Sequence, residues 1–328
     1  MRLNRRRLKV LGEMSGVYHC MTRVVAGERL LGRREKEVLR KQLHRQAEFC
    51  GVQVLTYCIM SNHFHVLVRV PPESETRGVG LEELVRRVGA LYPREKALAW
   101  EARLRGEDGE AARERLLARM GDVSQFMREL KHRFSLWYNR TRGRYGTLWA
   151  ERFKSVLVSP ERGALLAVSC YIDLNAVRAG LCTDPKDYRW CGYAEACGGS
   201  LGSRAGLQRM LELEDWGECQ KGYRVHLFGR ANAALMGEGR GLPGSVVARV
   251  KGREGELSLP EVLRCRVRYF TAGAAIGTRE FVEEVLRQNA GMFGKNRKSG
   301  AVRMRGKGLR EFYSLRNLQK NVLTSNEL

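Results

Sequence analysis

The sequence of 328 residues has only seven prolines, and no apolar run approaches the ~20 residues that a membrane-spanning helix needs. Its nine cysteines are odd in number and form no Cys-x-x-Cys pair. These absences exclude a proline-rich chain and a bilayer-spanning one, and they favour reduced, mostly buried thiols over a disulfide framework. With 43% apolar residues the chain can bury a sizeable core, so we expect a globular protein.

Acidic residues are scarce relative to basic ones. There are 36 Asp and Glu against 59 Lys and Arg, which gives a formal net charge of +23. So much like charge destabilises a compact state unless an anionic partner offsets it. Nucleic acid is the expected partner, and an anionic membrane is the weaker alternative. Residues 1–10 are basic but lack the apolar stretch of a secretory signal, so we expect a cytoplasmic, nucleoid-associated protein with no membrane role.

The spacing of apolar residues predicts a regular order of elements before residue 200. Strand, helix, strand, strand, helix, strand is the ferredoxin-like split β-α-β pattern, so the predicted class is α+β with an antiparallel sheet. The strands are expected over residues 17–24, 52–60, 63–70 and 151–158, and the helices over residues 34–50, 123–139 and from Ser159-Pro160 to Gly180. Ser61-Asn62 alone separates the two middle strands, as in a tight hairpin.

Two regions depart from this pattern. Residues 73–121 have balanced charge and helical spacing, with Gly106 and Gly109 as interruptions, which predicts a helical insertion. Residues 198–203 resemble a linker, and the chain beyond them is expected to be smaller and mainly helical, over residues 207–214, 260–269 and 279–288. We therefore predict one domain over residues 1–200 and an accessory, DNA-contacting region over residues 201–328.

Only two of the six histidines lie close together in the chain. Residues two apart on a strand point to the same face, so His63 and His65 would project side by side while Phe64 enters the opposite layer. Such a pair can chelate one cation, although two sheet histidines without a metal have the same pattern. A divalent site needs a further nitrogen or oxygen ligand from elsewhere.

The predicted helix from Ser159-Pro160 to Gly180 carries a stripe of residues one turn apart. Tyr171 and Asn175 lie on this stripe with Ala167 and Arg178, beside an apolar stripe, so their face is not expected to be simply core. A phenol next to a carboxamide can serve as nucleophile and metal ligand. The alternative is a half-buried tyrosine that only packs.

Residues 124–158 are both basic and aromatic. Aromatic rings that stack on unpaired bases contribute about 1–3 kcal/mol each, and we expect Tyr145 or Trp149, with Tyr138 as an alternative, to do so. Phe126, Phe134 and Trp137 are expected in the core. The cations expected to meet phosphates are Lys131, Arg133, Arg140, Arg142, Arg144, Arg152 and Lys154. The basic residues of 291–328 are a second candidate DNA contact.

Four segments within residues 15–195 share a further pattern. They are residues 60–66 (Met-Ser-Asn-His-Phe-His-Val), 146–154 (Gly-Thr-Leu-Trp-Ala-Glu-Arg-Phe-Lys), 171–181 (Tyr-Ile-Asp-Leu-Asn-Ala-Val-Arg-Ala-Gly-Leu) and 187–193 (Asp-Tyr-Arg-Trp-Cys-Gly-Tyr). Their sequences and order resemble those of the single-tyrosine transposases with a histidine-hydrophobe-histidine (HUH) motif, in particular the REP-associated tyrosine transposases and their insertion-sequence relatives. Ala176 replaces a proline of that family, and position 173, here Asp, varies within it; neither is catalytic there.

The resemblance implies metal-assisted cleavage and transfer of single-stranded DNA, with recognition of hairpin or repeat DNA. His63 and His65, with Asn175 as third ligand, would hold Mg²⁺ or Mn²⁺, and Tyr171 would attack the phosphodiester. The covalent 5′-phosphotyrosine would conserve the bond energy for a second strand end. No Gly-x-x-x-x-Gly-Lys-[Ser/Thr] loop for a nucleotide is present. Relatives include monomers and dimers, so the resemblance does not decide whether this protein forms a homodimer. It also does not identify the DNA target or the general acid or base.

Three other functions compete with this interpretation. A two-histidine phosphoesterase is excluded, because none of the histidines is followed two residues later by Ser or Thr. A replication or conjugation initiator is disfavoured because its nucleophile usually lies differently in the chain order. A domesticated DNA-binding protein, which recognises hairpins without cleaving them, remains the alternative.

Overall fold

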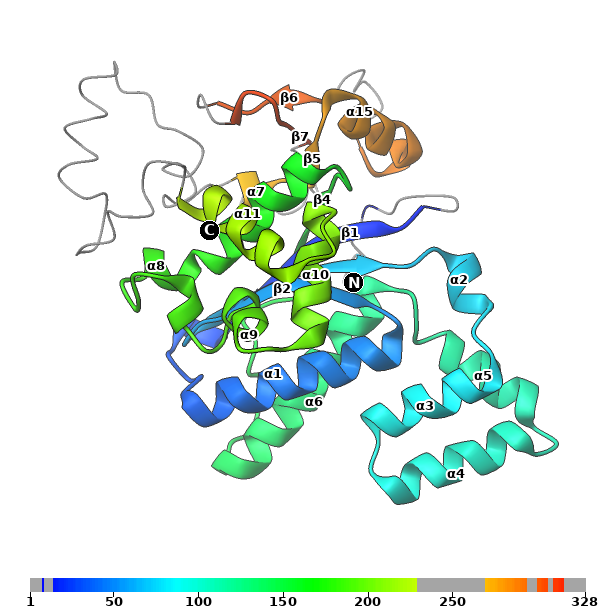
Figure 1. The fold of residues 1–328 in the computed structure, drawn as a ribbon. Coiled ribbons are helices and arrows are strands. Elements are labelled where there is room, and N and C mark those ends of the chain that lie inside the picture. The colour runs from blue at the N-terminus through cyan, green and yellow to red at the C-terminus, as the bar shows by residue number, and fades with distance from the viewer. Residues whose placement is uncertain (1–7, 9–13, 229–268, 294–299, 306–308, 316–328) are drawn as a thin grey trace, which may run out of the picture.

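The structure is a computed structural model that describes residues 8, 14–228, 269–293, 300–305 and 309–315. At its centre lies a seven-stranded sheet in the order β2-β3-β1-β4-β5-β7-β6 (Figure 1). The first four strands in this order pair antiparallel with one another. They are β1 (Gly16–Arg23), β2 (Gln53–Ile59), β3 (His63–Val70) and β4 (Lys154–Val158).

Two helices complete the ferredoxin-like unit. α1 (Arg33–Cys50) joins β1 to β2, and α6 (Val123–Arg142) precedes β4. This order of elements and strands is that of the split β-α-β fold, which confirms the predicted α+β class. Gly51 ends α1 with φ +66°, a left-handed conformation that costs glycine little because it has no Cβ.

The C-terminal residues extend this same sheet. β5 pairs parallel with β4, and β7 and β6 follow antiparallel. The sequence predicted only helices here; the three strands are too short to show a period-two pattern. The domain boundary near residue 200 stays a prediction. The elements are α10 (Leu201–Leu211), α11 (Trp216–Phe228), α14 (Tyr269–Ala272), β5 (Ala275–Gly277), α15 (Arg279–Gln288), β6 (Val302–Arg303) and β7 (Tyr313–Leu315).

The expected helix over residues 279–288 is confirmed as α15. Residues 260–268 of another expected helix lie outside the described residues, as do the first ten residues apart from Leu8 and much of the basic C-terminal stretch. Residues 201–203 of the expected linker form the first turn of α10, because Ser200 caps that helix by accepting from the Ser203 backbone N–H.

The two faces of the sheet bury separate cores. Tyr18, Phe64 and Val66 pack toward α1 and α6, while Val17 and Leu67 pack toward the other layer. That second layer consists of α7 (Arg162–Asp173), α9 (Gly192–Cys197), α10 and α11. In Figure 1, α1 and α6 lie below strands β1 and β2, and α7 and α11 lie on the opposite side of these strands. The alternation of β3 therefore sends its histidines toward α7, and Phe64 away from it, as predicted.

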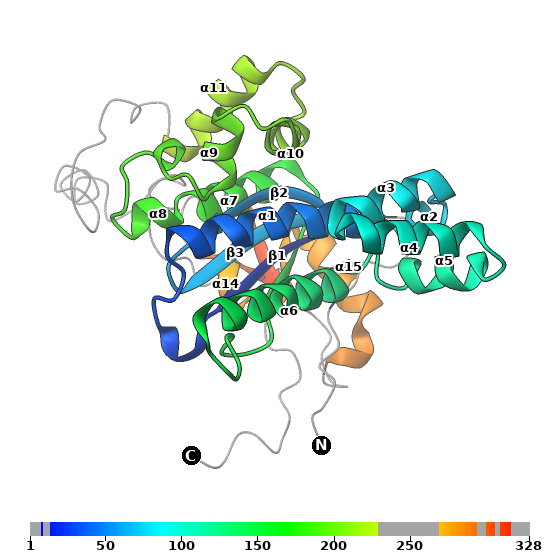
Figure 2. The same cartoon turned by 90° about the horizontal axis from the view of Figure 1, so that it is seen from below.

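The insertion between β3 and α6 is helical, as its pattern predicts. Its helices extend to one side, next to the end of α1 (Figure 2). Basic and acidic side chains of the insertion form exposed ion pairs, such as Arg86 with Glu48 of α1 and Arg105 with Glu82. The helices are α2 (Glu73–Arg77), α3 (Leu81–Leu91), α4 (Arg94–Arg105) and α5 (Gly109–Leu117).

Helix ends differ from the prediction at two places. α6 continues to Arg142, three residues beyond the expected end at residue 139, and stops at Gly143, which has φ +57°. α7 begins at Arg162 rather than at Ser159-Pro160, and it ends at Asp173. The short helix α8 (Asn175–Arg178) follows, and Gly180 then ends the segment with φ +66°, as expected.

The remaining short elements are 3-10 turns, η1 (Val25–Gly27), η2 (Pro185–Asp187) and η3 (Ala290–Met292). The cysteines that the structure describes are free thiols, most of them buried, which fits the expectation of reduced thiols. Among the described residues, no helix combines the length and apolarity required to cross a bilayer.

Candidate active site

The histidine pair lies at the start of β3, where the strand pairs with the end of β1. His63 pairs with Arg23 and His65 with Met21. The two imidazole centroids are 5.2 Å apart with ring planes at 86°, and Phe64 between them contacts Trp149 in the opposite layer. His65 is buried and His63 is half-buried. The same-face placement predicted from the strand is therefore confirmed.

A neighbouring side chain fixes how His63 presents its nitrogens. Asn62 Nδ2 donates to the Gly27 carbonyl at 3.1 Å, which orients the amide so that its oxygen faces His63. His63 Nδ1 lies 2.6 Å from that oxygen and donates to it. In the neutral ring the lone pair is then on Nε2.

A third histidine, His19 of β1, joins the pair. Its Nε2 lies 2.9 Å from His65 Nδ1, and its Nδ1 lies 2.9 Å from the Phe270 carbonyl oxygen. The ring is completely buried. Sequence reasoning assigned His19 no role, because its neighbours in the chain show nothing unusual. The available signal was its position on β1. His19 lies two residues from Val17 and therefore shares its face of the sheet, which is also the face of His65 once β1 pairs with β3.

Burial keeps both inner rings neutral. Complete burial lowers the pKa of His19 from 6.5 to about 4; the hydrogen bond to the Phe270 carbonyl acts in the opposite direction, and nearby Arg178 lowers the pKa further. Burial, and next the charge that His19 and His63 would carry, holds the pKa of His65 well below its usual range. Both rings are therefore uncharged at neutral pH.

Tyr171 of α7 faces the histidines from across the core. Its ring centroid is 6.2 Å from that of His65 and 6.3 Å from that of His19. Phe270 packs edge-on against it at 5.0 Å, and the Arg178 guanidinium lies 4.0 Å from its centroid. Only 3% of Tyr171 is exposed, so the tyrosine itself is buried, whereas Asn175 and Arg178 on the same stripe are half-buried, as expected of a face that is not simply core. Phe270, from the C-terminal segment, covers the Tyr171 side of α7, which the helix pattern alone does not reveal.

Asn175 lies one turn after Tyr171, at the start of α8. Its Nδ2 is buried and has no hydrogen-bond partner among the residues that the structure describes. In that same part of the chain, no three His, Cys, Asp or Glu side chains form a group able to hold a metal. Two imidazoles remain as nitrogen donors, and the Asn175 amide, whose oxygen is the atom able to ligate a cation, lies on the neighbouring helix. This donor set fits a cation held by few protein ligands, with its other positions left for oxygen.

A buried carboxylate anchors the tyrosine helix. Asp173 accepts hydrogen bonds from Tyr223 Oη of α11 at 2.6 Å and from Thr56 Oγ1 of β2 at 2.8 Å. Burial raises its pKa from 3.8 to about 7, although both hydroxyl groups lower it. No local pattern around Asp173 indicates this role, because Tyr223 is distant in the chain.

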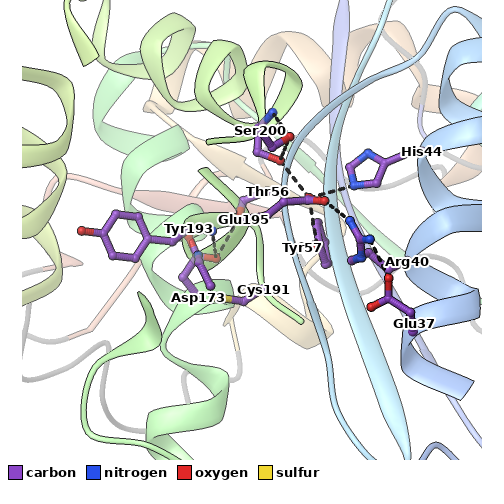
Figure 3. A network of polar contacts seen from close by, with 12 residues as sticks. Glu37, Arg40, His44, Thr56, Tyr57, Asp173, Cys191, Tyr193, Glu195 and Ser200 are labelled. Atoms are coloured by element: carbon purple, nitrogen blue, oxygen red, sulfur yellow. Dashed lines mark hydrogen bonds and ion pairs between the residues drawn. The ribbon is translucent and has the colours of Figure 1, made fainter. Parts of the chain in front are cut away.

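A second carboxylate ties the two layers together at the β2 edge. Figure 3 shows Glu195 of α9 between Arg40 and His44 of α1. Tyr57 Oη and Ser203 Oγ also donate to it, each at 2.9 Å. Burial opposes its ionisation, but these donors, His44 first, lower its pKa to about 2.

The basic loop after α6 reaches the histidine end of the sheet. Val24 forms an isolated bridge with Trp149, and the Ala150 N–H donates to the carbonyl of Arg23, the residue paired with His63. Arg140, Arg142, Arg152 and Lys154 are exposed, and Lys131, Arg133 and Arg144 are half-buried. Arg142 pairs with Glu35, Lys154 with Glu151, and Lys131 donates to the Glu151 carbonyl.

The aromatic residues of this region divide differently from the prediction. Tyr145 is 94% exposed, so its ring is available for stacking. Trp149 and Tyr138 are buried, and Trp149 Nε1 donates to the Lys131 carbonyl. The expected stacking role of Trp149 is therefore corrected: Phe64 and Phe134 pack against its ring and hold it in the core. Phe126 and Phe134 are fully buried, as expected.

Comparison with known proteins shows what parts of this chain are similar to. A comparison with curated proteins found no match. A solved structure described as "Structure of the REP associates tyrosine transposase bound to a REP hairpin" covers 61% of this chain and 87% of its own, at 14% identity and a TM-score of 0.38. Residues 14–79 match the model of the family described as "Transposase IS200 like". The segment with β1, α1 and the histidine strand therefore matches the IS200-like transposase family, as the motif at residues 60–66 predicts.

Proposed function

We propose that the protein cuts and transfers single-stranded DNA, with Tyr171 as the nucleophile and a Mg²⁺ or Mn²⁺ ion held by His63 and His65. The observation that carries the proposal is the approach of Tyr171 to His65, with ring centroids 6.2 Å apart, although the two residues come from distant parts of the chain. A nucleophile beside a pair of neutral imidazoles fits phosphodiester chemistry.

The residues divide the work of the reaction. When bound, the cation supplies Lewis-acid stabilisation of the non-bridging phosphate oxygens. His63 and His65 hold it, and Asn175 is the proposed third ligand. The Arg178 guanidinium, 4.0 Å from the Tyr171 ring centroid, places positive charge where the phenolate charge develops.

The covalent step balances without an external energy source. Tyr171 Oη loses its proton and forms a bond to phosphorus, while the bond from phosphorus to the 3′-oxygen breaks. The 3′-oxygen takes up a proton and leaves as a hydroxyl, and the 5′-phosphate remains on the tyrosine. Attack by another 3′-hydroxyl on this phosphotyrosine reverses the step and joins a new strand.

The closed packing around Tyr171 sets a requirement on this reaction. Because Phe270 packs on a ring that is only 3% exposed, the phosphate gains access only after Phe270 and its neighbours move aside. We propose that DNA binding provides this movement. The proposed contacts for single-stranded or hairpin DNA are the Tyr145 ring and the exposed cations from the end of α6 to the start of β4, which are Arg140, Arg142, Arg152 and Lys154.

Trapping of the covalent intermediate tests the proposal. Purified protein is incubated with labelled single-stranded hairpin DNA and Mg²⁺ or Mn²⁺, and the products are separated in SDS. We expect an SDS-resistant adduct that is absent in Tyr171→Phe, which lacks only the hydroxyl. Adduct formation that persists in Tyr171→Phe would refute the assigned nucleophile.

The burial of Tyr171 favours one second candidate function, a domesticated DNA-binding protein that recognises hairpins without cleaving them. It predicts tight hairpin binding and no adduct with any divalent cation. The same experiment therefore separates the two functions.

A further inference from the structure

We infer that His19 is a positioning residue that sets the tautomer of His65 and thereby presents the Nε2 lone pair of His65 to the cation. The inference rests on the proposed function, in which His65 is a metal ligand. It assigns a role to a side chain from a different strand, outside the histidine motif.

The proton position on His19 follows from its backbone partner. A carbonyl oxygen can only accept a hydrogen bond, so the contact of 2.9 Å between His19 Nδ1 and the Phe270 oxygen requires a proton on Nδ1. In a neutral imidazole the other nitrogen then carries a lone pair. His19 Nε2 is therefore an acceptor.

The second hydrogen bond transmits this polarity to His65. Because His19 Nε2 accepts, His65 Nδ1 must donate across the 2.9 Å that separate them. His65 then carries its one proton on Nδ1 and a lone pair on Nε2, the form in which an imidazole binds a metal. Both His19 nitrogens are engaged by Phe270 and His65, neither of which offers a carboxylate, and the charge of Arg178 further disfavours a charged His19 ring.

His63 shows the same polarity by a separate route. Asn62 is oriented by the Gly27 carbonyl and accepts from His63 Nδ1, which places the His63 lone pair on Nε2 as well. Each histidine of the pair therefore has its own outer partner, which fixes the same tautomer. A metal-binding histidine commonly donates its other N–H to an oxygen, as His63 does to Asn62, and for His65 a ring nitrogen takes the place of that oxygen.

The spacing of the pair agrees with a shared ion. Two imidazoles that bind one cation through nitrogens at about 2.1 Å have ring centroids roughly 4.5 to 5.2 Å apart. The observed separation between His63 and His65 is 5.2 Å. A role for His19 in packing alone would not require the hydrogen-bond chain, because a leucine fills a similar volume without polar atoms to satisfy.

Nitrogen-detected NMR of the metal-free, full-length protein tests the tautomer directly. Long-range proton–nitrogen correlations distinguish a protonated Nδ1 from a protonated Nε2. We expect His65 to carry its proton on Nδ1 in the wild type. In His19→Leu, which removes both hydrogen bonds, we expect His65 to shift toward the Nε2-protonated form.

Titration with Mn²⁺ gives the second readout. We expect His19→Leu to weaken Mn²⁺ binding about 10- to 100-fold. His19→Gln should restore most of the affinity, because its side-chain oxygen lies near the position of the missing Nε2 and can accept from His65. His132→Gln, a change of an exposed histidine on α6, is the matched control and should leave both readouts unchanged.

Several results would overturn the inference. They are a wild-type His65 protonated on Nε2, an unchanged Mn²⁺ affinity in folded His19→Leu, or a Mn²⁺ affinity that His65→Gln does not alter. If His19→Leu does not fold, the wild-type spectrum and His19→Gln still decide. Neither readout involves DNA. A failure to form the Tyr171 adduct would therefore refute the proposed function without refuting the role of His19. An unaltered tautomer and Mn²⁺ affinity in His19→Leu would refute the role of His19 without refuting the proposed function.

Discussion

The same strands present different kinds of side chain on the two faces of the central sheet. Toward α1 and α6, β3 contributes Phe64, Val66 and Val68, all buried and apolar. Toward α7, the same strand contributes His63 and His65, and β1 adds His19. Burying these rings costs solvation free energy, which hydrogen bonds to one another, to Asn62 and to the Phe270 carbonyl offset. Both faces bury a core, but the α7 face places polar rings at His19, His63 and His65, the proposed active site, where the other face has apolar side chains.

Adjacent substitutions on β3 should separate the two roles most clearly. Phe64→Ala removes a ring that is 1% exposed, and we expect a loss of about 3–5 kcal/mol in the free energy of unfolding. His65→Gln should cost much less stability and should abolish Mn²⁺ binding. Urea unfolding and Mn²⁺ titration measure the two effects. If Phe64→Ala and His65→Gln lost the same amount of stability and His65→Gln still bound Mn²⁺, the two faces would not have different roles.

The buried carboxylate on the α7 face predicts a pH dependence. The pKa of Asp173 is about 7 in the folded state against 3.8 ordinarily, so the folded state binds more protons between these values. This group's contribution to stability is therefore complete below pH 3.8 and is lost as the pH rises toward 7, by up to about 4 kcal/mol.

Asp173→Asn should remove this slope, because its amide does not titrate. The measurement is the difference in unfolding free energy between wild type and variant from pH 4 to 7.5. A difference that stays constant over this range would show that Asp173 does not titrate as described. Asp187→Asn, on the loop after α8, serves as a control for the loss of one acidic group.

The loop between α6 and β4 extends the comparison to the surface. Tyr145→Ala removes a ring that is 94% exposed, and we expect single-stranded DNA binding to weaken by about 1–3 kcal/mol without a change in Tm. Fluorescence anisotropy at fixed salt gives the affinity. Leu136→Ala, an exposed apolar change on α6, is the control, and the assignment fails if both variants bind alike.

The smallest expected effect lies at the edge that joins the two layers. The pKa of Glu195 is about 2 against 4.5, so its contribution to stability is present above pH 4.5 and is lost as the pH falls toward 2. Allowing for partial solvent screening, Glu195→Gln should lose about 1–2 kcal/mol at pH 7 and little at pH 2.5. Urea unfolding at the two pH values measures this, and a larger loss at pH 2.5 would reverse the assigned sign.

Much of the ferredoxin-like unit follows from local pattern. The alternation over residues 63–70 predicted β3 and the shared face of its histidines, and the helical spacing before Gly51 predicted α1. The helix start at Ser159-Pro160 was wrong because Ser159 belongs instead to the buried end of the β4 segment, where its N–H donates to the Ile276 carbonyl. The strands β5, β6 and β7 were missed because strands of two or three residues depend on their neighbours.

The sequence by itself determined which side chains alternate across β3, the basic surplus and the motifs that match the IS200-like family in residues 14–79. Only the tertiary structure decided that His19 bonds to His65, that Phe270 covers Tyr171 and that Trp149 is buried. The physical reason is one of range. Periodicity depends on backbone geometry a few residues long, whereas hydrogen bonds and burial depend on which distant segments the folded chain brings together.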